Sequence, residues 1–218
     1  DELKKMDLDG VRIGYDHAYS YEDVDTEIAN LVLGTLEVFK DRGAVIVDMT
    51  MPPVDDYLGA WKTLCSAEAF DAHSEHYPSR SSDYGLWFRG WLENGASVSA
   101  LDYVRANYDR IKCNALIAEA FSEVDAMICP TIIRFPHDVD DSVHYGPMDS
   151  MRGTSFQRFT VPFDYNGYPT VSVPCGFGSQ GMPASLQIVG EPFSEELICK
   201  IAYAYETSTE WHTKHPVS

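Results

Sequence analysis

The apolar residues of the chain follow two periods, and each period predicts one type of element. Short runs rich in β-branched residues, bounded by Gly, Pro or Asp, predict strands at Gly10–Tyr15, Ala44–Met49, Asp125–Thr131, Thr170–Pro174 and Ala184–Val189. The first two runs flank a helical segment, which predicts a β-α-β unit with parallel strands. Because Ala44–Met49 is nearly all apolar, we expect this strand to be covered on both faces.

Apolar spacings of three and four residues predict three helices. The first begins after Asp25 as N-cap, ends before Gly43, and has an apolar face of Ile28, Leu31, Val32, Leu36 and Phe39. The second is a long helix with a spaced set of Leu101, Val104, Tyr108, Ile111, Ala115 and Ala118. The last begins after Ser194 and carries Leu197, Ile198, Ile201, Ala204 and Tyr205.

The remaining segments contain turn and loop signals. The sequence GFGSQGMP (176–183) favours a hairpin turn, and FTVPFDYN (159–166) favours a constrained turn before a buried strand. We expect irregular or helical structure at 52–99 and a long polar loop at 132–158. Since no repeat, low-complexity tract or clear linker occurs, we expect residues 1–218 to form one α/β unit.

The composition narrows the class of protein. A net charge of −18 argues against binding to nucleic acid, whose phosphates require clusters of Lys and Arg. No run approaches the ~18 apolar residues of a membrane helix, and the charged start DELKKMDLDG does not resemble a secretory signal. The five cysteines are widely spaced and include no C-x-x-C, which favours reduced thiols. We therefore expect a cytoplasmic protein without a membrane partner.

Three groups of histidines are candidate metal ligands. The loop HDVDDSVH (137–144) has oxygen ligands at calcium-loop spacing, but Val143 stands where such loops need Gly. The pairs His73/His76 and His212/His215 have a spacing of three residues, whereas zinc hydrolases of the H-E-x-x-H type use four. We therefore predict no metal and no cofactor.

Candidate nucleophiles are few. Cys175 has no base near it in the sequence, and a buried inert thiol is the commoner role. The pair Ser81–Ser82 lies in SRSSDYG, where a single glycine follows it. A Ser hydroxyl needs a base within hydrogen-bond reach, and an oxyanion hole beside it, to act as a nucleophile in acyl transfer. We do not assign Ser81, Ser82 or Cys175 as the nucleophile.

The segment from Phe159 to the end of the chain resembles the C-terminal block of the amidase signature family. The family pattern runs approximately T-x-P-F-N-x-x-G-x-P-A-x-S-V-P-C-G, then G-L-P-x-G-L-Q-I-x-G and P-F-x-E, with a terminal helix ending near W-H. Residues in register with this pattern are Thr160, Pro162, Phe163, Gly167, Pro169, Ser172, Val173, Pro174, Cys175, Gly176, Gly181, Pro183, Leu186, Gln187, Ile188, Gly190, Pro192, Phe193, Glu195, Trp211 and His212. The segments LDGVRIGY, LEVFKDRGAVIVDMTMPP and EVDAMICPT also resemble the family, and the match is weakest at 57–95. Asp164 replaces the usual Asn.

This resemblance implies a fold and an activity. The fold would be the C-terminal part of the amidase signature fold, a mixed and mostly parallel sheet flanked by helices. The activity would be hydrolysis of a small-molecule carboxamide at its C–N bond through a seryl acyl-enzyme. The family's catalytic Lys, bridging Ser and nucleophilic Ser precede the matched part, and this chain contains no G-G-S-S-G-G run. We therefore expect this chain alone to be inactive, with the N-terminal half of the amidase as its partner and homo-oligomers left open.

The resemblance also implies a substrate pocket near the loop 159–167 and the segment GTSFQRFT (153–160). The residues expected to line the pocket are Thr131, Phe135, Thr154, Gln157 and Arg158. In the tRNA-dependent amidotransferase relatives an Asp lies about where Gln157 falls, so a neutral Gln implies a different substrate. Arg158 could pair with an anionic group of the substrate or form a surface salt bridge. The loop could also be a turn that only delivers a core strand.

Two other functional classes stay open beside an amidase half. One is a truncated, non-catalytic paralogue that binds a partner or ligand. The other is a metal-binding protein built on HDVDDSVH. An unpaired sheet edge in an isolated half would favour aggregation or tight binding to the missing half.

Overall fold

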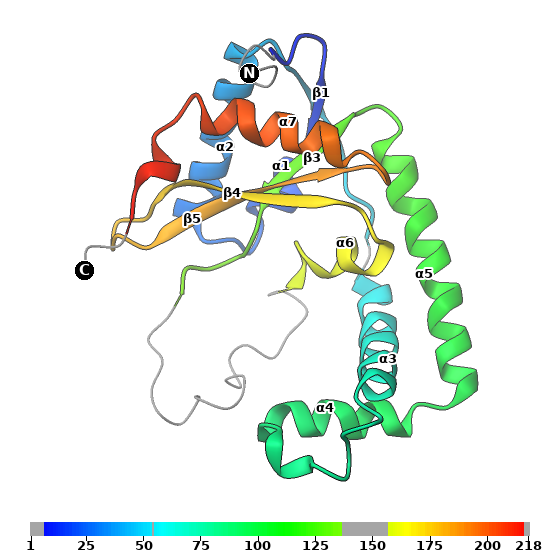
Figure 1. The fold of residues 1–218 in the computed structure, drawn as a ribbon. Helices are drawn as coiled ribbons and strands as arrows, with labels where there is room; N and C mark the ends of the chain where they lie inside the picture. The colour runs from blue at the N-terminus through cyan, green and yellow to red at the C-terminus, as the bar shows by residue number, and fades with distance from the viewer. Residues whose placement is uncertain (1–6, 54, 137–156, 216–218) are drawn as a thin grey trace.

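The computed structural model describes residues 7–53, 55–136 and 157–215. Its centre is a five-stranded sheet in the order β2-β1-β3-β5-β4 (Figure 1). The strands are β1 (Arg12–Tyr15), β2 (Val45–Asp48), β3 (Ala126–Pro130), β4 (Thr170–Phe177) and β5 (Pro183–Gly190). β1 pairs in parallel with β2 and β3, whereas β5 pairs antiparallel with β3 and β4. The predicted mixed α/β sheet flanked by helices is confirmed, with two parallel pairings and two antiparallel pairings that both involve β5.

The β-α-β unit is present at the N-terminal end of the described chain. After β1 come the short helix α1 (His17–Tyr21) and then α2 (Thr26–Asp41), which leads into β2. Asp25 caps α2 by accepting a hydrogen bond of 2.9 Å from the N–H of Glu27, and Gly43 leaves the helix at φ +90°. The prediction that β2 is covered on both faces is wrong. β2 is an edge strand, and Val45 is 51% exposed.

Helices cover both faces of the sheet. On one face, α7 (Glu195–Glu206) packs close to Gly190 through Ile198, and α2 approaches Gly176 through Leu31. Alternate residues of a strand point to opposite faces, so Gln187 lies on the face away from α7. The rings of Phe39 and Tyr205 stack at 5.4 Å and join α2 to α7 within the core.

The segment 159–167 is a short helix followed by a left-handed residue, whereas the sequence predicts a turn. α6 (Val161–Asn166) has Pro162 in its first turn, where no N–H is needed, and Gly167 at φ +75° ends it. Val161, Pro162, Phe163 and Tyr165 are buried. The hydroxyl of Tyr165 donates a hydrogen bond of 2.7 Å to the main-chain carbonyl of Ala106. This bond connects α6 to a long helix of the helical arm, which is described next.

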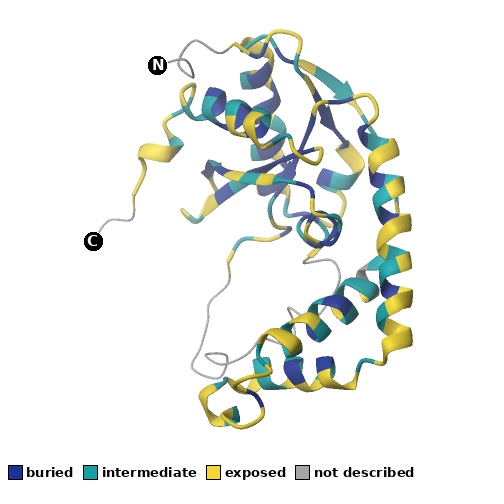
Figure 2. Cartoon of the chain, turned by 45° about the vertical axis from the view of Figure 1, so that its right-hand side comes forward, coloured by how far each residue is buried: buried dark blue, intermediate teal, exposed yellow. Residues whose placement is uncertain are grey.

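Three helices form an arm that extends away from the sheet (Figures 1 and 2). They are α3 (Asp55–Ala72), α4 (Leu86–Ser97) and α5 (Ala100–Phe121), with the 3-10 turn η2 (Ser81–Asp83) before α4. α3 packs against both α4 and α5. The long helix predicted from the spacing of Leu101 to Ala118 is confirmed, but it buries a different face, with Ala106, Cys113, Ile117 and Phe121. A second 3-10 turn, η6 (Trp211–Thr213), follows α7.

Within the described ranges, no helix combines the length and apolar character that crossing a membrane requires.

Candidate functional site

Asp16 lies directly after the carboxyl end of β1 and organises the backbone there. Its side chain is buried, with an exposed fraction of 6%. One carboxylate oxygen accepts a hydrogen bond of 2.9 Å from the N–H of Tyr19 and so caps α1. The other oxygen accepts a hydrogen bond of 2.7 Å from the N–H of Met51, beyond the end of β2. In open α/β sheets, ligands bind outside the carboxyl ends of strands, and this is the end that Asp16 holds in place.

Arg158 is fixed beside α1 by contacts of three kinds. Its guanidinium carbon lies 4.9 Å from the centre of the Tyr19 ring and 5.3 Å from that of Phe159. Its Nη1 donates a hydrogen bond of 2.6 Å to the carbonyl of Glu22. The Tyr19 hydroxyl in turn donates to the main-chain carbonyl of Arg158. The other N–H groups of the guanidinium have no hydrogen-bond partner within 7–53, 55–136 and 157–215, so the cation is held in one place with donors left for a ligand.

Gln187 links this cation to the sheet. Its side chain is 5% exposed, and Nε2 donates a hydrogen bond of 2.6 Å to the carbonyl of Phe159. The same nitrogen lies 3.5 Å from the sulfur of Cys129, which is opposite Gln187 in the β3–β5 pairing. The position of Arg158 therefore depends on a buried amide in the middle of β5.

Three hydroxyl groups lie next to Gln187 on the sheet. The Thr131 Oγ1 is 3.1 Å from the Oγ of Ser172 and 3.2 Å from that of Ser185. Ser172 is the partner of Gln187 in the β4–β5 register. Because cross-strand partners project from the same face, these hydroxyls and Arg158 flank Gln187 on one side of the sheet. We call Asp16, Tyr19, Thr131, Arg158 and Gln187 the strand-end site.

This arrangement can bind and orient a polar molecule. Hydroxyl groups can donate to a carbonyl oxygen or accept from an N–H group, and a guanidinium can pair with a carboxylate. Acyl transfer also needs a nucleophile in contact with a base. In the part of the chain that the structure describes, no Ser hydroxyl is hydrogen-bonded to the side chain of a Lys or His; the Ser79 hydroxyl reaches only the main-chain carbonyl of His76. Ser82 contacts only Asp83, at 3.5 Å, in the η2 turn at the end of the arm.

The cysteines do not supply the nucleophile either. All five are free, and burial raises the pKa of both Cys129 and Cys175 to about 12. A thiol with such a pKa is protonated at neutral pH, and the thiolate is the reactive form. This agrees with the interpretation of Cys175 as an inert core residue.

The structure describes four of the five residues expected to line a pocket, and it separates these four. Thr131 and Arg158 belong to the strand-end site. Phe135 lines a different cavity of about 290 Å³, together with Glu27 of α2, Arg134, and residues of the β4–β5 turn that include Ser179. Gln157 is exposed, and its main-chain carbonyl accepts a hydrogen bond from the N–H of Thr160. Thr154 lies outside the described residues, so its role stays a prediction, as do those of the other four.

The structure describes two of the three histidine groups considered as metal ligands. The loop 137–144 lies outside the described residues. His73 is near an aromatic cluster, with Nδ1 3.0 Å from the Tyr84 hydroxyl, and His76 is exposed. In the described ranges no three His, Cys, Asp or Glu side chains are grouped so that they could hold a metal ion.

Sequence reasoning did not single out Asp16, Tyr19, Ser172, Ser185 or Gln187 as site residues. A polar residue directly after a predicted parallel strand was an available signal for Asp16. Tyr19 and Arg158 are 139 positions apart, and no local pattern indicates that they meet.

Comparison with known proteins identifies the family and shows what part of it is present. The Amidase family model matches residues 1–199. An amidase of Pseudomonas putida is 28% identical over 95% of this chain and 45% of its own length. A glutamyl-tRNA(Gln) amidotransferase component from Clostridium acetobutylicum is 32% identical over 95% of this chain and 47% of its own length. The chain thus spans about half the length of these relatives.

Two solved structures share the fold of this chain. The 6-aminohexanoate cyclic dimer hydrolase matches with a TM-score of 0.82 and 20% identity, over 99% of this chain and 48% of its own. A bacterial aryl acylamidase of the amidase signature family matches with a TM-score of 0.79 and 20% identity, again over 99% and 48%. The match of the family model across residues 1–199 establishes that the chain belongs to the Amidase family.

Proposed function

We propose that this chain forms the C-terminal half of an amidase that hydrolyses the C–N bond of a small-molecule carboxamide through a seryl acyl-enzyme. One observation carries this proposal: an Amidase-family chain with an ordered set of binding groups at its strand ends and, in its described part, no Ser paired with a Lys or His base. The nucleophilic Ser, bridging Ser and Lys would come from the N-terminal half, as a separate or cleaved chain or as part of a longer protein.

Arg158 and Thr131 have the most direct roles in this proposal. Arg158 would pair with an anionic group of the substrate, because its guanidinium is fixed by Tyr19 and Glu22 and faces no carboxylate within 4 Å in the described residues. Thr131 would hydrogen-bond the polar groups next to the scissile amide. Phe135, Thr154 and Gln157 would line the rest of the pocket. The uncharged Gln157 favours a substrate without a cationic group at that position.

The N-terminal half would extend the sheet at β4. This strand pairs only with β5 among the described strands, so its other edge has main-chain donors and acceptors without a sheet partner. The edge lies next to Ser172 and therefore next to the hydroxyl groups of the site. A partner at this edge would bring its catalytic groups close to the strand-end site.

Reconstitution tests this proposal. The chain would be produced alone and together with an amidase N-terminal half that carries the Gly/Ser-rich segment, and both samples would be assayed with neutral and carboxylate-bearing amides. We expect hydrolysis only in the combined sample. Arg158→Ala should lower kcat/KM by about tenfold or more for carboxylate-bearing amides, in line with a lost charged hydrogen bond. Arg12→Ala is the matched control, because Arg12 pairs with Glu123 at the other end of β1. Hydrolysis by the chain alone would overturn the proposal.

A non-catalytic binding protein is the second candidate. The described residues contain no Ser paired with a Lys or His base. This observation favours a binding protein as much as a two-part enzyme. A combined sample that forms a stable complex, binds amides and does not hydrolyse them would support this second candidate. A cytoplasmic location is part of both proposals.

A further inference from the structure

Helix α5 is apolar on two sides, and only one of them is covered. The covered side holds Ala106, Cys113, Ile117 and Phe121 and faces α3 and α6. The other side holds four large apolar residues, and their exposed fractions are 56% for Leu101, 46% for Val104, 61% for Tyr108 and 63% for Ile111. Large apolar residues that gather on one exposed face, bordered by polar residues, mark contact surfaces. The second side of α5 therefore has the character of an interface.

The exposed residues form one continuous stripe, which we call the α5 stripe: Leu101, Val104, Tyr108, Ile111, Ala115 and Ala118. Their spacings of three and four residues place them on one face of the helix. At 1.5 Å per residue the stripe is about 26 Å long. Its first four members are large and its last two are alanines, so the two ends of the stripe have opposite shapes.

We propose that the α5 stripe binds the α5 stripe of a second copy of this chain, in antiparallel orientation about a two-fold axis near Ile111. In this arrangement Tyr108 faces Ala115 of the second copy, and Val104 faces Ala118 of the second copy. Tyr108 and Val104 thus meet small side chains, and Ile111 meets its own equivalent at the axis. A two-fold interface uses the same surface on both protomers, so each of these contacts occurs twice.

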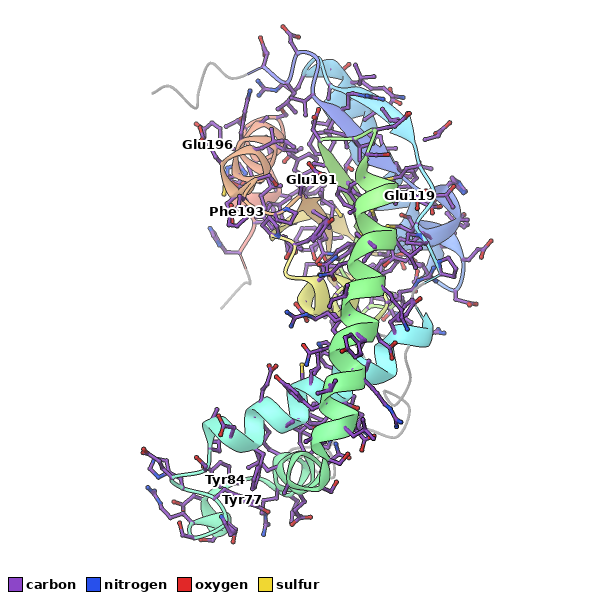
Figure 3. All side chains as sticks on the ribbon, turned by 90° about the vertical axis from the view of Figure 1, so that its right-hand side faces the viewer. Tyr77, Tyr84, Glu119, Glu191, Phe193 and Glu196 are labelled. Atoms are coloured by element: carbon purple, nitrogen blue, oxygen red, sulfur yellow. The ribbon has the colours of Figure 1, made fainter. Side chains whose placement is uncertain are left out.

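The charges beside the α5 stripe fit the same arrangement. Arg105 lies on the border of the stripe in its first half, and its side chain is 67% exposed and only 4.0 Å from Asp102. Glu119 is exposed near the other end of α5, where Figure 3 labels it, and its spacing of about four helical turns from Arg105 places it on the same border. Antiparallel pairing about Ile111 brings Arg105 opposite Glu119 of the second copy. Lys112 approaches its own equivalent near the axis, and Asp109, at 3.1 Å, compensates its charge.

A second copy fits the α5 stripe better than the rest of an amidase does. The side of α5 that carries Ala106 contacts α6, the segment next to the strand-end site. The α5 stripe lies on nearly the opposite side of the helix, and Figure 2 shows exposed positions repeating along this outer side. The proposal takes a partner that adds to β4 to approach α5 from the covered side and to leave the α5 stripe free. The inference goes beyond the proposed function and holds whether or not the chain takes part in catalysis.

Disulfide trapping tests the geometry. In a Cys199→Ser background, Ile111→Cys places one thiol at the proposed two-fold axis, and mild oxidation should give a disulfide-linked dimer in high yield. Ala118→Cys is the matched control on the same stripe. Its two thiols would lie about 21 Å apart in the antiparallel pair, so it should not link. Linking of Ala118→Cys but not Ile111→Cys, or of neither variant, would overturn the proposal.

Charge reversal tests the ion pairs independently. Sedimentation should show a dimer whose dissociation constant rises about tenfold or more in Arg105→Glu and in Glu119→Arg. The double variant, with both charges reversed, should recover most of the lost affinity. Monomers at every concentration in the unmodified chain, or no recovery in the double variant, would contradict the assignment.

Discussion

The buried amide of Gln187 donates a hydrogen bond of 2.6 Å to the main-chain carbonyl of Phe159. This bond connects the middle of β5 to the segment that carries Arg158, across 28 positions of the sequence. The stability of the fold and the position of the proposed substrate-binding cation thus depend on the same side chain.

Gln187→Leu should therefore destabilise the fold. The substitution leaves the buried carbonyl of Phe159 without its donor, which costs about 1–3 kcal/mol of the free energy of unfolding. Urea unfolding would measure this change. Gln180→Leu, at an exposed position in the β4–β5 turn, is the control and should stay within about 0.5 kcal/mol of the unmodified chain. Equal effects of the two substitutions would contradict the role assigned to Gln187.

The contact between Glu27 and Ser179 predicts a pH dependence. The Glu27 carboxylate accepts hydrogen bonds from the Ser179 hydroxyl, at 2.7 Å, and from its N–H, at 2.5 Å. These bonds lower the pKa of Glu27 below its ordinary value of 4.5. The stabilisation is fully present above pH 4.5 and is lost as the pH falls through the lowered pKa.

Glu27→Gln should reduce the free energy of unfolding at pH 7, and the difference from the unmodified chain should shrink as the pH falls below 4.5. Urea unfolding at a series of pH values measures this difference. Glu196→Gln removes an exposed carboxylate from the first turn of α7 and is the control for charge near a helix start. A difference for Glu27→Gln that does not change with pH would show that the hydrogen bonds to Ser179 do not favour the charged carboxylate.

Two glycines of α4 should respond to alanine in opposite ways. A Cβ at Gly95 would lie 1.9 Å from the main-chain oxygen of Ser66, so α3 and α4 would have to move apart. We expect Gly95→Ala to destabilise the chain by about 1–3 kcal/mol. A Cβ at Gly90 has no atom within 4 Å, so Gly90→Ala should stabilise the exposed helix by about 0.5–1 kcal/mol. Thermal unfolding distinguishes the two, and stabilisation by Gly95→Ala would refute the close packing of α3 on α4.

The thiols should differ in reactivity. Cys199 is exposed, whereas Cys113, Cys129 and Cys175 are buried and Cys65 is half-buried. Burial also raises the pKa of Cys65 and Cys113 to about 11. We expect a thiol reagent at neutral pH to label Cys199 rapidly and the others only after unfolding in urea. Rapid labelling of Cys175 in the folded chain would revive it as a candidate nucleophile.

The sequence predicts where helices and strands lie in the chain better than it predicts which of their faces and edges are covered. The Asp25 cap, the α2 face and the α7 face are confirmed because local spacing and capping chemistry determine them. The position of β2 at the edge of the sheet was not predictable, because an apolar run fits a central strand and an edge strand equally well. In α5, the most regular apolar spacing marks the exposed side, since Tyr165 and the arm cover the other side.

The candidate site was predictable only in part. The family resemblance led to Thr131 and Arg158, and the structure brings both to the strand-end site. The partners that fix them, Tyr19 and Gln187, are distant in sequence and meet Arg158 and Phe159 only through the folded sheet. The cytoplasmic location and the organisation of residues 1–218 as one unit stay predictions.

Labelling with a serine-directed reagent tests the central claim most directly, which is that this chain supplies the pocket of an amidase and not its nucleophile. The protein would be isolated from its natural source, treated with a fluorophosphonate, and analysed by denaturing mass spectrometry and peptide mapping. The account predicts that the adduct lies on a Ser outside these 218 residues, in a Gly/Ser-rich segment of a partner chain or of a longer protein. An adduct on Ser81, Ser82 or any other Ser of this chain, formed in parallel with loss of amide hydrolysis, would contradict it.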